Sequence, residues 1–134
     1  MRDTVWLENR MNQIKDMLFP DLEFKNQVSI RFKGKWRNKF GHIRMLKDKS
    51  TEIVINSLFS NNDVPEYVID LTIAHELAHY LHGFHSPLER KYNHPHKGGV
   101  VTKELVKRGF GYLVKRERYF IKNEWVKIYK RLAL

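Results

Sequence analysis

Two histidines and a glutamate that fall within five residues are the part of this sequence best suited to chemistry. His75, Glu76 and His79 form the pattern His-Glu-x-x-His. Because residues i and i+4 of a helix lie on one face, both imidazoles can bind a single metal ion. Glu76, one position further round the helix, can reach a water molecule on that ion without binding the metal. A zinc-dependent peptidase has this arrangement, with the glutamate as general base, so we expect Zn²⁺ as the cofactor.

Catalytic zinc usually takes three protein ligands and leaves its fourth position to water, so a third ligand must come from outside this turn of helix. His82 lies roughly 10 Å along the helix axis from His75, too far to share its metal, so we expect it at the rim of the site or behind the ligands. His85 has the spacing of the third ligand in the metzincin pattern. That pattern also needs a glycine where His82 stands and a methionine downstream, and all four methionines precede the motif.

The segment after the helix offers three further candidates. Residues 85–99 form a polar loop rich in histidine, proline and glycine, and loops of this length are uncommon unless they have a function. His96 stands shortly before the helix expected from Val100, and the glycines between them let the backbone approach closely. We therefore favour His96 as the third ligand, with His94 and Glu104 as the alternatives.

Three stretches of the sequence resemble the SprT-like (Spartan-type) zinc metallopeptidases. They are EIVINSLF at residues 52–59, VPEYVIDLTIAHELAH at residues 64–79, and HKGGV at residues 96–100. The resemblance covers roughly residues 28–109. It implies a zincin-like fold and the cleavage of proteins that are bound or crosslinked to DNA. It also implies Glu76 as the catalytic base and three zinc ligands, His75, His79 and His96.

Two other metallopeptidase families share part of this pattern. The stretch AHELAHYL at residues 74–81 also resembles the ImmA/IrrE-type regulatory proteases, although the helix expected next in them is missing. The small glutamate-ligated minigluzincins would use Glu104 as the third ligand. We rank these two resemblances second and third.

Length and composition narrow the class of protein. A chain of 134 residues with 42% apolar and 13% aromatic residues is expected to fold as one domain with a buried core. The absence of cysteine excludes disulfides, thiol catalysis and cysteine-ligated zinc, and fits a cytoplasmic protein. No apolar run is long enough to span a bilayer, and the N-terminus does not read as a signal peptide. We expect a cytoplasmic protein that can associate with the nucleoid and has no membrane partner.

The net charge of +10 favours an acidic partner, and nucleic acid is the first candidate. From Lys97 onward the chain has eleven Lys and Arg against three Glu, and residues 24–46 contain no acid. We therefore expect DNA as a partner beside the protein substrate. The alternative function is a basic nucleic-acid-binding protein whose zinc site is structural or degenerate.

Periodicity predicts the secondary structure that positions these residues. Helices are expected at Thr4–Leu18, at Val100–Arg108 and from Ile121 onward. A further helix, which carries the His-Glu-x-x-His pattern, is expected to end at about Leu81. Its N-cap is expected at Asp63, with Pro65 in its first turn. Strands are expected at 28–32, at 36–40 as part of a hairpin, at 52–56 and at 112–114. The fold class is α+β, with an N-terminal helix, a short antiparallel sheet, the active-site helix and a following ligand helix. The domain comprises a core at 28–109 and a basic extension at 110–134.

Overall fold

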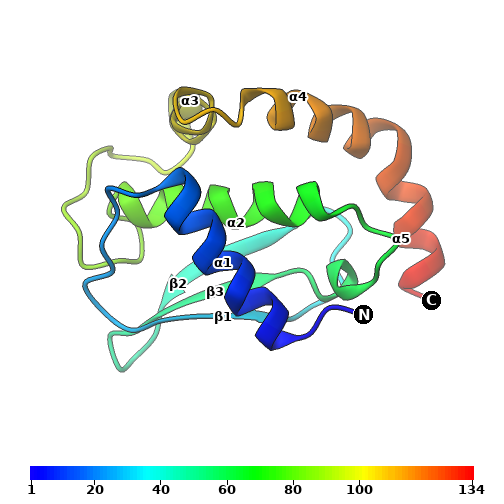
Figure 1. The fold of residues 1–134 in the computed structure, drawn as a ribbon, viewed down its shortest axis with the longest axis horizontal. Helices are drawn as coiled ribbons and strands as arrows, with labels where there is room; N and C mark the ends of the chain where they lie inside the picture. Colours follow the sequence, from blue (N-terminus) through cyan, green and yellow to red (C-terminus); the bar gives the residue numbers. More distant parts are fainter.

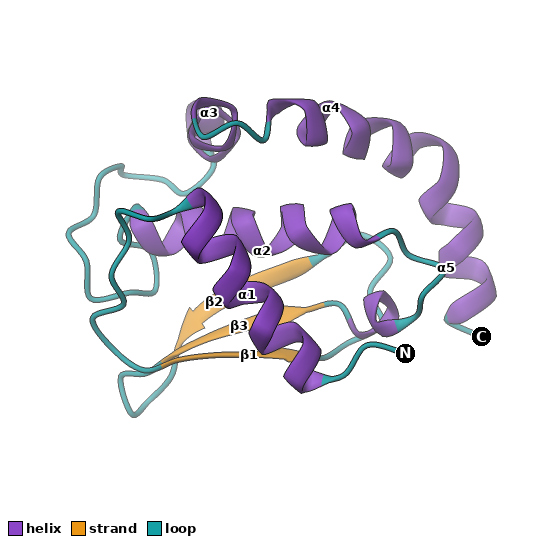
Figure 2. Cartoon of the chain, viewed as in Figure 1, coloured by secondary structure: helices purple, strands orange, loops and turns teal.

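A computed structural model of the chain describes residues 1–134 and has an α+β architecture, as the sequence predicts. The three strands form one sheet. This sheet lies on one side of the molecule and the helices lie on the other (Figures 1 and 2). The strands are β1 (Val28–Phe32), β2 (Gly41–Met45) and β3 (Thr51–Ile55). The helices are α1 (Thr4–Leu18), α2 (Glu66–Leu81), α3 (Val100–Lys107), and a C-terminal helix of three consecutive parts, α4 (Gly111–Phe120), η3 (Ile121–Trp125) and α5 (Val126–Leu132). Two short 3₁₀ turns, η1 (Ser57–Ser60) and η2 (Lys97–Gly99), complete the set.

The sheet is mixed, so the prediction of a purely antiparallel sheet is wrong. Its strand order is β1-β3-β2, in which β1 runs parallel to β3 and β2 runs antiparallel to it. No hairpin joins β1 to β2, because Gly34, at φ +82°, turns the chain out of the sheet and residues 33–40 form a connection without strand structure. β3 enters between the other two strands and is buried along its whole length, as a central strand must be.

The helix α2 lies between the sheet and the pair α3 and α4, while α1 crosses beside it (Figure 1). This position explains why α2 is buried on almost every side rather than along one stripe. Arg10 of α1 holds α2 through two hydrogen bonds of 2.5 Å to the carboxylate of Asp70. The helix that carries the His-Glu-x-x-His pattern is therefore held by the sheet, by α1, and by the pair α3 and α4.

The start of α2 differs from the prediction. The helix begins at Glu66, with Pro65 in the N-cap position and no side-chain cap. Asp63 instead accepts a hydrogen bond of 2.8 Å from Arg131 of the C-terminal helix. A tertiary ion pair thus replaces the local cap that sequence spacing alone suggests.

The strand expected at 112–114 is also wrong, because these residues belong to α4. Leu113 and Phe120 are both buried, and a separation of seven residues corresponds to two turns of a helix. Further along, Trp125 packs edge-on against Phe40 and Phe59, with ring centroids 5.4 Å from each. Residues 110–134 thus contribute to the same core as the sheet and α2. None of the helices combines the length and apolar character required to cross a membrane.

Candidate metal centre

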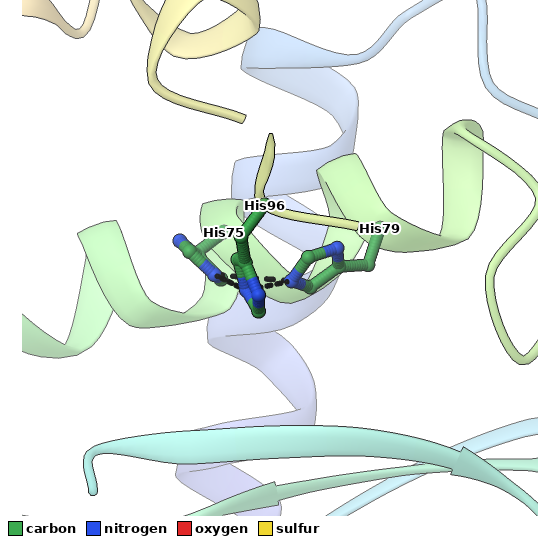
Figure 3. A group of neighbouring side chains, drawn as sticks. All are labelled: His75, His79 and His96. Atoms are coloured by element: carbon green, nitrogen blue, oxygen red, sulfur yellow. Dashed lines mark hydrogen bonds between the residues drawn. The ribbon is translucent and has the colours of Figure 1, made fainter. Parts of the chain in front are cut away.

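Three histidine side chains converge between α2 and the loop that follows it (Figure 3). His75 and His79 come from successive turns of α2, and His96 is brought back to them from the loop. The Nε2 atoms of His79 and His75 lie 3.1 Å apart, those of His79 and His96 3.0 Å apart, and those of His75 and His96 3.4 Å apart. The structure therefore brings together the three histidines that the sequence singles out, in a cluster that can hold a metal ion.

The triangle of nitrogens fits a cation better than it fits hydrogen bonding. The Nε2 of a neutral imidazole is either a donor or an acceptor, so among three such atoms at least one pair must be alike and repel. A cation at the centre satisfies all three at once. Tetrahedral zinc with Zn–N bonds of about 2.0–2.1 Å would place its nitrogen ligands roughly 3.3 Å apart, close to the separations between these atoms.

The environment keeps these imidazoles in the form that binds metals. Burial, and then the charge of the neighbouring imidazoles, lower the pKa of His75 to about 4 and that of His79 to about 3. Both rings are therefore neutral at neutral pH, with a lone pair free on one nitrogen. A metal ion need not displace a proton from either ring under these conditions.

The Glu76 carboxyl lies beside the cluster and is only 4% exposed. Burial raises its pKa to about 8, and the nearby Lys39 offsets part of the increase. Together with the three histidines, Glu76 lines a cavity of about 170 Å³ that opens to solvent. A cation bound to the imidazoles would favour the ionised carboxylate, which is the form that accepts a proton.

The alternative third ligands lie elsewhere. His94 is exposed and outside the cluster. Glu104 lies 2.9 Å from His82 and 2.9 Å from Arg108, so its carboxylate is occupied by these two partners. His85 lines the cavity, but its Nδ1 accepts a weak hydrogen bond of 3.4 Å from the backbone of Met45.

Of the two positions expected for His82, the one at the rim of the site is wrong. Its side chain is completely buried behind α2, in contact with Glu104. Spacing along the helix axis shows correctly that His82 cannot join His75 and His79. It gives no indication that α3 covers this end of α2, which is why the burial of His82 could not be foreseen.

Glycines return the chain from α2 to the site and then to α3. Gly83 turns the chain at the end of α2 with φ +82°, and a Cβ there would lie 2.5 Å from the carbonyl oxygen of Glu89. After His96, Gly98 and Gly99 both adopt positive φ, which directs the backbone into α3. These positions explain why a loop with so little regular structure can present His96 to α2.

The opposite wall of the cavity is not predicted by the sequence. Gly41, His42 and Ile43 of β2 line it, facing the histidines from the edge of the sheet. Only the pairing order of the strands places β2 here, and no local pattern in the sequence encodes that order.

Comparisons of the chain with models of known protein families, with curated proteins and with solved structures find no match.

Proposed function

We propose that this protein is a zinc-dependent endopeptidase. The observation that carries the proposal is the convergence of His75, His79 and His96 within 3.4 Å of one another, with the buried carboxyl of Glu76 in the same cavity. Three imidazoles that converge at the wall of an open cavity are a ligand set that suits zinc. When bound, zinc would lower the pKa of a coordinated water towards 7 and polarise a substrate carbonyl.

Glu76 would act as the general base in this proposal. Its carboxylate would take a proton from the attacking water and pass that proton to the nitrogen of the leaving amine. The position of this carboxyl, in the same cavity as the three histidines, suits both steps.

The free edge of β2 supports a peptide as the substrate. The backbone amide of Asn56 donates to the carbonyl of Phe40, and the amide of Leu46 donates to the carbonyl of Ser50. The even-numbered residues of this segment therefore direct their backbone groups toward β3. Since backbone groups alternate in direction along a strand, the amide and carbonyl of Ile43 point away from β3, at the cavity. An extended peptide could pair with this edge and lie across the three histidines.

Removal and return of the metal tests the proposal. Wild-type protein loaded with one equivalent of zinc should cleave casein, lose that activity after dialysis against a chelator, and recover it when zinc is added. The His79→Ala variant should not recover. Casein cleavage that persists in the chelated protein would contradict the proposal.

The resemblance to SprT-like peptidases favours a zincin-like fold and substrates that are bound or crosslinked to DNA. An exposed stripe on the C-terminal helix supports contact with nucleic acid. Tyr112 and Tyr119 are 69% and 62% exposed, and Lys115 and Lys122 are also exposed. Along the chain these four residues follow one another at intervals of three or four. These four side chains share one face of the helix, where tyrosines can stack on bases and lysines can pair with phosphates.

Nucleic-acid binding is therefore the second candidate function, and it can accompany proteolysis or stand alone. A Tyr112→Ala/Tyr119→Ala variant should bind single-stranded DNA on the order of tenfold more weakly, because stacking on each base contributes. Val5→Ala, which changes an exposed side chain on α1, is the matched control. Equal DNA binding by the wild type and the double variant would remove the support that this stripe gives.

A further inference from the structure

A second cavity, of about 300 Å³, lies beside the first on the side of α3 and α4. The two cavities share Gly41, His75 and Glu76, so a peptide bond at the first cavity has the second directly next to it. Four apolar side chains from separate parts of the chain line the second cavity among polar residues, and these are Phe40, Leu71, Leu105 and Val114. A cavity in this position is suited to the side chain of a substrate residue that adjoins the scissile bond.

A single carboxyl group other than that of Glu76 lines the second cavity, and it belongs to Glu117 of α4. Glu117 takes part in none of the ion pairs of the molecule. Burial raises its pKa to about 7, and no charged group of the chain counteracts that increase. The carboxyl thus lies in a poorly solvated position without the cation that such a group usually has.

Lys39, the lysine that lines the second cavity, does not supply that cation. Its ammonium group lies over the ring of Trp36, 4.4 Å from the centroid. The segment that carries it is firmly held, because the side-chain amide of Asn56 donates to the carbonyls of Trp36 and Lys39 at 2.7 and 2.8 Å. Trp125 donates to the carbonyl of Arg37 at 2.7 Å and fixes the same segment from the C-terminal helix. This wall of the cavity is therefore preformed.

We propose that the second cavity is a specificity pocket that binds a lysine or arginine side chain next to the scissile bond, with Glu117 as its anionic partner. The inference rests on the proposed peptidase function and names the substrate class of that site. The four apolar side chains of the cavity would cover the aliphatic stem of the side chain, and Glu117 would pair with its cationic head. An acidic side chain would meet Glu117 as a like charge and be rejected.

The cleavage profile of the zinc-loaded protein tests this inference. Digestion of a mixed peptide library should give products in which Lys and Arg are enriched on the order of tenfold at one position beside the cleaved bond. Glu117→Gln should lose that enrichment and keep cleavage, and Glu117→Lys should favour Asp and Glu instead. Glu124→Gln, which removes an exposed carboxylate from the same C-terminal helix, should keep the wild-type profile. Cleavage without enrichment of Lys and Arg would overturn the inference.

A binding measurement separates this inference from the peptidase proposal. Two alanine-based decapeptides, one with a central lysine and one with the isosteric norleucine, are titrated against Glu76→Gln and against Glu76→Gln/Glu117→Gln. The lysine peptide should bind the first variant on the order of tenfold more tightly than the norleucine peptide, and the second variant equally. If no protein is cleaved in any assay, the peptidase proposal fails, whereas this difference still supports the pocket. Equal binding of both peptides to Glu76→Gln, or binding of neither, would overturn the pocket itself.

Discussion

The Nε2 of His82 and a carboxylate oxygen of Glu104 lie 2.9 Å apart in the interior, and this contact joins the end of α2 to α3. Arg108 extends the contact, since it donates to Glu104 at 2.9 Å and to Asp21 at 2.6 and 2.8 Å. The loop that carries His96 spans the interval between these two helices. The contact therefore fixes both ends of that loop. Neither His82 nor Glu104 belongs to the histidine cluster itself.

Glu104→Ala should destabilise the fold without removing the metal. Its loss leaves the ring of His82 buried without a hydrogen-bond partner, which costs about 1–3 kcal/mol. Urea denaturation should show this decrease in the free energy of unfolding, while competition with a chelator should show zinc affinity changed by less than roughly tenfold. A loss of zinc affinity as large as that of His79→Ala would instead identify Glu104 as a ligand.

His96→Ala should reduce zinc affinity by at least about 100-fold, because one of three converging nitrogens is lost. His94→Ala is the matched control, since it removes an exposed imidazole two residues away. Chelator competition measures both variants under the same conditions. If His94→Ala weakens zinc binding and His96→Ala does not, the assignment of the third ligand is wrong.

Gly41→Ala should impair both stability and activity. The added methyl group would lie 2.7 Å from the carbonyl oxygen of Val54 and 2.9 Å from Thr72, so β2 and α2 would have to separate. Such overpacking costs about 1–3 kcal/mol and would move β2 away from Glu76. Gly111→Ala, where the nearest atoms are at ordinary contact distance, should be neutral or slightly stabilising. Thermal unfolding that is identical for the two variants would refute this account of Gly41.

The part of the site that the sequence predicts is the part that local spacing controls. The bounds of α1 agree with the structure, and the helical interval between His75 and His79 determines two of the three clustered nitrogens. The pairing of β1 with β3, and the helical conformation of Tyr112 to Val114, are decided by contacts between distant segments. For the same reason the sequence did not reveal the second cavity, because four separate elements form its walls.

Glu117→Gln should stabilise the protein at high pH and have little effect at low pH. The carboxyl has a pKa of about 7 in the folded protein against about 4.5 when unfolded, so the folded state binds more protons between these values. Stability therefore falls as the pH rises from 4.5 to 7, and the variant removes this loss. Urea denaturation should show a gain of about 2 kcal/mol at pH 8 and almost none at pH 4. Glu124→Gln should show no such pH dependence, and a gain for Glu117→Gln that is equal at both pH values would contradict the explanation.

The most direct test of the central claim compares the wild type with Glu76→Gln in one experiment that measures zinc content and the initial rate of casein cleavage. Because Glu76 lies beside the three histidines without joining their cluster, the variant should retain one zinc per chain. Its cleavage rate should nevertheless fall by about 100-fold or more, since the general base is lost. A zinc-loaded Glu76→Gln protein that cleaves casein as fast as the wild type would contradict the account.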